Sequence, residues 1–242
     1  MAKYKVLSTK KLEPSLLKKA REKDIEIIEQ EFISVKPIWS PEKLKEIIRY
    51  AESGKQFIVF TSANAVEAVD KYMHVGDTYY VIAWKMFCLS GKTKQAILNA
   101  EFLEKDVICE AENATALAGK IIEQKVGQVV FFCGNKRRDE LPSILRNAGI
   151  TVHEVVVYET VQTPVTVRDT IDGILFFSPS AVQSFFSVNQ LKQDAVCFAI
   201  GQTTADSVVD YCDNKIIISE SPSRETMLAS VNFYFQNKAC YE

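Results

Sequence analysis

Short apolar segments alternate with amphipathic segments along the whole chain of 242 residues, and this alternation limits the possible folds more than any other feature. A short apolar run between polar turns is typical of a buried strand, and apolar residues spaced three or four apart are typical of a helix covering a sheet. Strands that alternate with helices form parallel sheets with helices on both faces, so the sequence predicts the α/β class. The expected strands are Tyr4–Leu7, Glu26–Glu29, Phe57–Phe60, Tyr79–Ile82, Phe87–Leu89, Val107–Cys109, Val129–Phe132, His153–Val157, Ile174–Phe177, Cys197–Ile200 and Ile216–Ile218; the expected helices include Ser15–Lys23, Pro41–Ser53, Ala65–Tyr72, Leu141–Ala148 and Thr204–Tyr211.

Polar turns recur at matching places in the two halves of the chain. The segment Phe60–Val66 (FTSANAV) resembles Phe177–Val182 (FSPSAV), and each follows an apolar strand and precedes a helix. Self-similarity of this kind indicates an internal repeat. Two further pairs follow in the same order, namely Leu89–Thr93 with Ile200–Thr204, and Glu112–Leu117 with Ser221–Leu228.

One strand–helix–strand unit is left over in each half, at opposite ends of the two repeats. Val130–Pro164 resembles Lys5–Pro37. A tandem duplication would place both units at the same end, so we expect the first unit to join the C-terminal third. The predicted domains are therefore residues 1–36 plus 162–242, and the continuous residues 37–161. They are two similar parallel sheets flanked by helices, joined by two crossing linkers near Val35–Pro41 and Tyr158–Pro164, with a cleft between. Chance similarity among α/β turns is the alternative.

The composition excludes several kinds of site. With 29 basic and 31 acidic side chains, the net charge of −2 gives no reason to expect a nucleic-acid partner. The nine glycines form neither a G-x-G nor a P-loop, which excludes both phosphate cradles. The six cysteines form no C-x-x-C and the two histidines have no partner at ligand spacing, so we expect reduced thiols and no metal. An apolar signal sequence and a membrane span are also absent, so we expect a cytoplasmic protein that does not contact membranes.

Strands repeatedly end in Ser, Thr, Asn or Gly before a helix begins. Such turns gather at the carboxyl edge of a parallel sheet, where ligands bind, and the amide groups of each first helical turn remain free to bind anions. Two edges of this kind suit a ligand with several carboxylates. An ordinary helix cap is the simpler interpretation of any single turn. Basic residues lie at several of the same turns, namely Lys10, Lys11, Lys92, Arg137, Arg138 and Arg224.

In order along the chain, these turns resemble the motifs of the uroporphyrinogen-III synthase family. The resemblance covers essentially the whole sequence and implies a cofactor-free enzyme that closes the linear tetrapyrrole hydroxymethylbilane, with inversion of ring D and loss of water. The segments that carry it are Thr61–Val66, Phe177–Val182, Ala199–Ala205, and Gly134 through Arg138, Leu141, Leu145, Gly149 and Val152 to Val157–Thr160.

The resemblance also implies site residues. Tyr158 matches a tyrosine of the family's cleft, and because a phenol is protonated at neutral pH, it is the candidate proton donor to the leaving hydroxyl. Simple packing at the domain junction is its alternative role. The family often has Arg where Lys10 stands and before Gly134, where this chain has Cys133, so carboxylate contacts there are altered. The expected substrate-binding residues are Thr9, Lys10, Thr61, Ser62, Asn64, Gly91, Lys92, Thr93, Gly134, Asn135, Arg138, Ser178, Ser180, Gly201, Thr203 and Thr204.

The expected partner is the small-molecule substrate hydroxymethylbilane. We expect the protein to be a monomer that makes at most transient contact with the deaminase that produces this substrate. A second class of function, ligand binding without catalysis, remains open at this point. Two α/β domains with a cleft also describe a small-anion sensor without catalysis.

Overall fold

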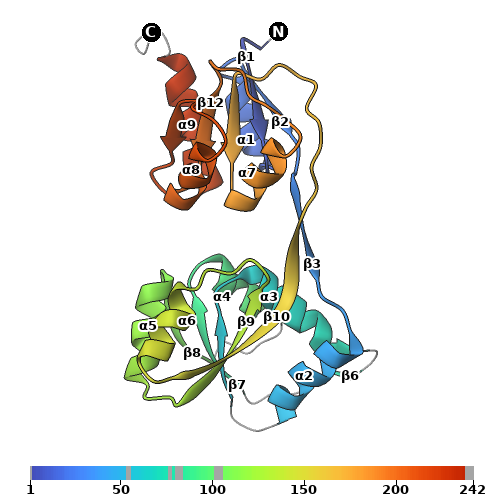
Figure 1. Ribbon diagram of the computed structural model, residues 1–242, viewed down its shortest axis with the longest axis vertical. Helices are drawn as coiled ribbons and strands as arrows, with labels where there is room; N and C mark the ends of the chain where they lie inside the picture. The colour runs from blue at the N-terminus through green and yellow to red at the C-terminus, as the bar shows by residue number, and fades with distance from the viewer. Residues whose placement is uncertain (1, 53–55, 76–77, 80–83, 101–105, 238–242) are drawn as a thin grey trace. The chain divides into compact units, whose positions relative to one another are not determined.

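The two larger sheets of the described residues belong to two units of the chain (Figure 1). The structure is a computed structural model that describes residues 2–52, 56–75, 78–79, 84–100 and 106–237. Unit 1 consists of Met1–Ser34 and Val161–Glu242, and unit 2 of Val35–Thr160. One unit is therefore discontinuous in sequence, and the other is a single stretch.

Unit 1 contains a five-stranded sheet in the order β13-β12-β11-β1-β2, and all its neighbouring strands are parallel. In the described residues of this unit, helices α1, α7, α8 and α9 connect or follow the strands. The strands are β1 (Tyr4–Ser8), β2 (Ile25–Glu29), β11 (Gly173–Phe176), β12 (Val196–Ala199) and β13 (Ile216–Ile218); the helices are α1 (Pro14–Arg21), α7 (Pro179–Phe186), α8 (Gln202–Val209) and α9 (Arg224–Gln236).

The core of unit 1 has two layers because successive strand side chains point to opposite faces of the sheet. Val6 packs on the side of α1 and α9, with Leu16 and Leu228. Its neighbour Leu7 packs on the side of α7, with Phe185. Both layers are buried, which accounts for the apolar strands of the sequence.

Unit 2 contains a six-stranded sheet in the order β3-β10-β9-β4-β7-β8. The pairs from β10 to β8 are parallel. A short antiparallel pair, β5 and β6, lies apart from this sheet. The strands are β3 (Ile33–Pro37), β4 (Gln56–Phe60), β5 (His74–Val75), β6 (Thr78–Tyr79), β7 (Trp84–Leu89), β8 (Val107–Ala111), β9 (Gln128–Gly134) and β10 (Thr151–Gln162); the helices are α2 (Pro41–Glu52), α3 (Ala63–Met73), α4 (Lys92–Asn99), α5 (Ala114–Glu123) and α6 (Glu140–Asn147).

The sheet of unit 2 is also covered on both faces. Phe132 packs with residues of α2, α3 and α4 on one face, where Ile47 and Val69 are fully buried. Phe131 packs on the opposite face against α5 and α6, where Leu117 and Leu145 are fully buried. The predicted α/β class, with parallel sheets flanked by helices, is confirmed.

The strand orders of the two units agree with the internal repeat. From one edge they read β13-β12-β11-β1-β2 in unit 1 and β8-β7-β4-β9-β10 in unit 2. The matching turns of the sequence follow β4 and β11, β7 and β12, and β8 and β13. The leftover units β1-α1-β2 and β9-α6-β10 occupy the same positions in their sheets, although they lie at opposite ends of the repeats.

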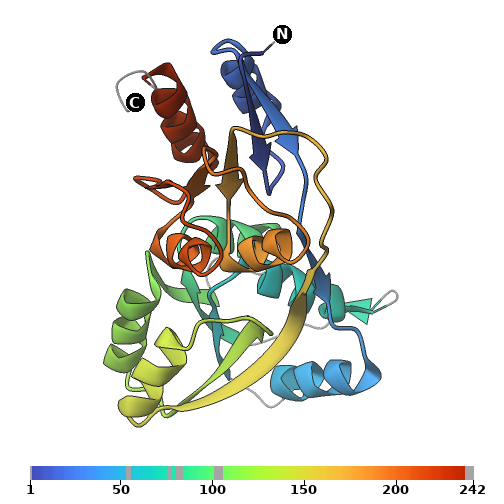
Figure 2. The ribbon, with the colours of Figure 1, turned by 45° about the horizontal axis from the view of Figure 1, so that its top comes forward.

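The segments predicted as crossing linkers are partly strands, because Val35–Pro37 belongs to β3 and Tyr158–Gln162 to β10. β3 and β10 run side by side in both views (Figures 1 and 2) and pair in the sheet of unit 2. Ile38 N donates to Val157 O at 3.0 Å, and Thr163 N donates to Phe32 O at 2.9 Å. This antiparallel pattern extends β10 well beyond the predicted His153–Val157. The predicted strand Tyr79–Ile82 lies outside the described residues apart from Tyr79, which belongs to β6.

Candidate active site

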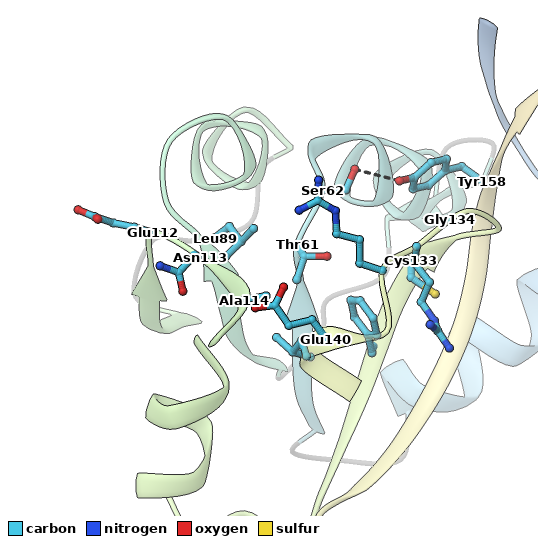
Figure 3. Close-up of a pocket in the computed structure, with 14 residues that line it drawn as sticks. Thr61, Ser62, Leu89, Glu112, Asn113, Ala114, Cys133, Gly134, Glu140 and Tyr158 are labelled. Carbon is cyan, nitrogen blue, oxygen red and sulfur yellow. Dashed lines mark hydrogen bonds between the residues drawn. The ribbon is translucent and has the colours of Figure 1, made fainter. Parts of the chain in front are cut away.

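A pocket of about 380 Å³ opens at the carboxyl edge of the unit 2 sheet (Figure 3). Its lining comes from the ends of β4, β7, β8 and β9, from Tyr158 of β10, and from the first residues of α5 and α6. Parallel strands place all these ends at one edge, which is where α/β proteins bind ligands. The lining residues are Thr61, Ser62, Leu89, Glu112, Asn113, Ala114, Phe131, Cys133, Gly134, Arg137, Arg138, Glu140, Leu141 and Tyr158.

The phenol of Tyr158 is held against the turn that follows β4. Its Oη donates a hydrogen bond to Ser62 Oγ at 3.2 Å (Figure 3). The ring lies directly over Gly134, because a Cβ built on this glycine would be 2.4 Å from Tyr158 Cζ and 2.5 Å from Cε2. Side chains do not approach a Cβ this closely. Only a glycine at 134 therefore leaves room for this placement of the phenol.

Asn135 fixes the backbone around Tyr158 from both sides. Its amide N donates to Tyr158 O at 3.1 Å, and its side-chain Oδ1 accepts from Thr160 N at 2.9 Å. The pairing of β9 with β10 is irregular between Val156 and Tyr158, so regular strand hydrogen bonds are interrupted there. Asn135 does not line the pocket. Its side chain holds the strand that carries the tyrosine.

Ion pairs hold the loop between β9 and α6. Arg137 Nε donates to Glu154 of β10, and Arg137 Nη1 pairs with Asp139 Oδ1 at 2.9 Å. Arg146 pairs with the second oxygen of the same Glu154 carboxylate. This network ties the loop and α6 to β10. Arg138, next along the loop, is exposed and also lines the pocket.

Cys133 lines the pocket as a neutral thiol. It is buried, and burial raises its pKa to about 11; the nearby Glu154 carboxylate adds to the rise, and Arg137 opposes it. A thiol with this pKa remains protonated at neutral pH. Cys133 therefore brings no charge to the pocket.

Two carboxylates also line the pocket, and the sequence did not indicate either of them as a site residue. Glu112 and Glu140 are both exposed. In Figure 3 the carboxylate of Glu140 points toward Thr61, whereas that of Glu112 points away from it. Thr115 Oγ1 donates to Glu140 Oε1 at 2.5 Å.

Of the residues predicted for the site, the structure brings Thr61, Ser62, Gly134, Arg138 and Tyr158 to this pocket. The other predicted residues of unit 2 lie elsewhere on the same sheet edge or within its helices. Asn64 is in α3, and Gly91, with a φ of 71°, precedes α4. Lys92 and Thr93 open α4, and Thr93 is buried. These four residues are not among those lining the pocket.

The predicted residues of unit 1 lie at the carboxyl edge of that unit's own sheet. The Thr9 hydroxyl is buried; it donates to Leu175 O at 2.8 Å and accepts from Phe177 N at 3.3 Å. Ser178 Oγ accepts from Ala181 N at 3.2 Å as the cap of α7. Both hydroxyls thus have structural partners.

The remaining predicted residues of unit 1 differ in exposure. Lys10 and Thr203 are exposed, Ser180 and Gly201 are half-buried, and Thr204 is buried. Gly201 precedes α8, and Thr204 N donates to its carbonyl at 3.1 Å.

Some pocket residues belong to a repeated turn of the sequence but were not predicted as site residues. Glu112, Asn113 and Ala114 form the third turn of the repeat in unit 2, and Asn113 caps α5 by accepting from Ala116 N at 2.9 Å. Leu89, Phe131 and Leu141 look like ordinary core residues in the sequence. Their place in the pocket follows from the packing of α5 and α6 on the sheet.

The described residues contain no group of three or more His, Cys, Asp or Glu that could hold a metal ion. Among the same residues, no helix is long and apolar enough to cross a bilayer.

A comparison with protein-family models shows the family of this chain. The family model of uroporphyrinogen-III synthase HemD matches residues 15–229. This chain belongs to that family. Uroporphyrinogen-III synthases are cyclising lyases of tetrapyrrole biosynthesis, and the resemblance inferred from the turns is confirmed.

Solved structures of uroporphyrinogen-III synthases have the same fold. A mutant enzyme from the extremely thermophilic bacterium Thermus thermophilus is 14% identical with a TM-score of 0.65, and the alignment covers 97% of this chain and 99% of that chain. The enzyme from Helicobacter pylori is 16% identical with a TM-score of 0.64, over 94% of this chain and 98% of that chain. Comparison with curated proteins gives no match.

Proposed function

We propose that this chain is a uroporphyrinogen-III synthase that converts hydroxymethylbilane to uroporphyrinogen III with loss of water. The observation that carries the proposal is the match of the family over residues 15–229, together with a tyrosine of the family motif in a pocket at the carboxyl edge of a parallel sheet. The comparisons give no support to the alternative of an anion sensor without catalysis.

Tyr158 is the proton donor in this proposal. The reaction begins when the terminal hydroxyl of the substrate leaves as water, and a neutral phenol within hydrogen-bond reach can supply the proton. In the structure the phenol donates its hydrogen bond to Ser62 Oγ at 3.2 Å. In the bound state the leaving oxygen takes the place of Ser62 as acceptor. The close fit over Gly134 keeps the ring oriented for this exchange.

The substrate's carboxylates are bound by guanidinium, hydroxyl and backbone amide groups. Arg138 and Thr61 line the pocket, and α5 begins at the same place with Ala114. A helix N-terminus favours anions through its free N–H groups and its dipole. We propose that the turns of unit 1 at Ser178 and Gly201 bind carboxylates in the same way.

The enzyme's main task is selection between two ring closures. The bilane also cyclises unaided to the symmetric isomer, so the enzyme has to stabilise attack by the substituted carbon of ring D, which forms a spiro-pyrrolenine. Each factor of ten in selection requires about 1.4 kcal/mol of differential transition-state stabilisation. Holding the reacting atoms at near-attack distance can supply several such factors.

The test is an isomer analysis with the purified full chain. Hydroxymethylbilane is generated from porphobilinogen with its deaminase, the products are oxidised, and the uroporphyrin isomers are separated by chromatography. We expect predominantly isomer III, in proportion to enzyme. Isomer I alone, formed at the rate of the reaction without this protein, contradicts the proposal.

We also propose that the protein acts in the cytoplasm as a monomer without a cofactor, and that it takes its substrate from the deaminase by transient contact. Dialysis against a chelator should leave its activity unchanged. Its mass by light scattering should be that of one 27.3 kDa chain.

A further inference from the structure

We propose that Glu140 is a catalytic residue that contacts the tetrapyrrole and stabilises the positive charge that develops when the hydroxyl leaves. The inference rests on the proposed function. It assigns a role to a carboxylate that neither the family motifs in the sequence nor the Tyr158–Ser62 pair accounts for.

The carboxylate of Glu140 is oriented by its neighbours. Glu140 is the first residue of α6, and Thr115 Oγ1 of α5 donates to its Oε1 at 2.5 Å. This bond fixes one oxygen from the side of α5. In Figure 3 the carboxylate points toward Thr61 within the pocket. The preceding Asp139 pairs with Arg137 and accepts a hydrogen bond from Ser143, so its carboxylate already has partners in the loop and in α6.

A negative group is unexpected in a pocket for a substrate with several carboxylates, because like charges in contact disfavour binding. The tetrapyrrole also has pyrrole N–H donors, however, and these need acceptors once water is excluded. A carboxylate is an acceptor at both oxygens. Glu140 therefore suits the pyrrole part of the substrate, while Arg138 and the helix amides suit its carboxylate side chains.

The charge balance of the first step gives the carboxylate its catalytic value. When the C–O bond breaks, the oxygen leaves with both bonding electrons and takes a proton from the phenol of Tyr158, which forms water. The pyrrole is left as an azafulvene cation and its N–H becomes a stronger donor. A carboxylate at that N–H interacts more strongly with the cation than with the neutral ground state, which lowers the barrier.

A structural role for Glu140 makes different predictions. An acidic residue in the first turn of a helix interacts favourably with the helix dipole, and the Thr115 bond joins α5 to α6. If these were its only functions, replacing it would lower the melting temperature and leave turnover by the folded enzyme unchanged.

The test compares Glu140→Gln with the wild-type protein in the isomer assay and by thermal unfolding. Glutamine keeps an oxygen that can accept from Thr115 and removes only the charge. We expect kcat for isomer III to fall about tenfold or more, equivalent to about 1.4 kcal/mol of transition-state stabilisation. KM should change less than about threefold, and Tm by less than about 2 °C. Because the uncatalysed closure competes, the fraction of isomer I should rise.

Two further variants sharpen the result. Glu123→Gln removes an exposed charge at the end of α5, far along the helix from the pocket lining, and should leave kcat unchanged. Thr115→Val leaves the Glu140 charge but removes the donor that orients it. As Thr115 is a positioning residue, we expect an intermediate loss of kcat, about threefold, with KM unchanged.

An unchanged kcat for folded Glu140→Gln, or a loss no larger than that of Glu123→Gln, overturns the proposal. If Glu140→Gln does not fold, an unchanged kcat for Thr115→Val overturns it. The isomer assay of the wild-type protein distinguishes failure of the Glu140 proposal from failure of the proposed function. Isomer III from the wild type with unchanged variants refutes Glu140 alone, whereas isomer I from the wild type refutes the synthase activity itself.

Discussion

Replacing Gly134 by alanine should displace the tyrosine that the active site depends on. The added Cβ would lie 2.4 Å from Tyr158 Cζ and 2.8 Å from its Oη, where ordinary contacts begin at 3.4 Å. The ring must therefore move by about 1 Å. It cannot do so and keep the 3.2 Å hydrogen bond to Ser62.

The expected cost has two parts. Overpacking at a fixed backbone destabilises proteins by about 1–3 kcal/mol, and Asn135 holds the backbone here. Misplacement of a reacting group by about 1 Å can lower the rate a hundredfold. We expect Gly134→Ala to unfold at a lower denaturant concentration and to form isomer III at least tenfold more slowly.

Gly119→Ala is the matched control. Gly119 lies in α5, and a Cβ there meets nothing within 4 Å. Because alanine is the better helix former by about 1 kcal/mol, this variant should be as stable as the wild type or more stable. Its activity should not change. Both variants are measured by urea unfolding and by the isomer assay.

A double-mutant cycle with Tyr158→Ala isolates the contact. Without the ring, Gly134→Ala loses its steric partner, and the coupling free energy between the two substitutions should exceed about 1 kcal/mol. A Gly134→Ala protein with wild-type stability and turnover refutes the reasoning. So does a coupling energy near zero, since the destabilisation would then have another cause.

Further outcomes follow from the other contacts. Tyr158→Phe should lower turnover severalfold or more with an unchanged melting temperature; unchanged turnover removes the phenol from the mechanism. Asn135→Ala should cost about 1 kcal/mol in urea unfolding and reduce turnover, because the strand carrying Tyr158 loses its side-chain acceptor; Asn135→Asp, which keeps that acceptor, should lose less. Thr9→Val should destabilise unit 1 by about 1–3 kcal/mol, since the Phe177 amide loses this acceptor and the Leu175 carbonyl keeps only the Thr9 amide as a donor, and Thr9→Ser should not. Burial raises the pKa of the Cys88 and Cys133 thiols to about 11 from an ordinary 9.0, so their contribution to stability is complete below pH 9 and is lost as the pH rises toward 11. Unfolding midpoints at pH 8 and 10.5 should therefore differ more in the wild type than in Cys88→Ala/Cys133→Ala, and equal differences would contradict this assignment.

The sequence predicted well where a local pattern determines the structure. The Thr61–Ser62 turn could be placed at the carboxyl edge of a sheet because an apolar strand precedes it and a helix follows it. Gly134 and Tyr158 were found through the family motif. Their contact could not be foreseen, because it depends on the irregular pairing of β9 with β10.

Other parts depended on packing that local patterns do not specify. Tyr158 was expected in a linker, but pairing with β3 makes that segment part of a long strand. The prediction that Asn135 contacts the substrate did not include the bond that its side chain accepts from Thr160 N. The position of the Glu140 carboxylate could not be predicted, because it depends on the packing of α5 beside α6, which brings Thr115 to it.

The order of the strands has a consequence for how the chain is made. β1 lies between β2 and β11, and Thr9 bonds to Leu175, 166 positions later in the sequence. At a synthesis rate of about 5–20 residues per second, this partner follows on the order of ten to thirty seconds later. Unit 2 is continuous and can complete its sheet in that interval. β1 therefore keeps one edge without its partner until β11 has been synthesised.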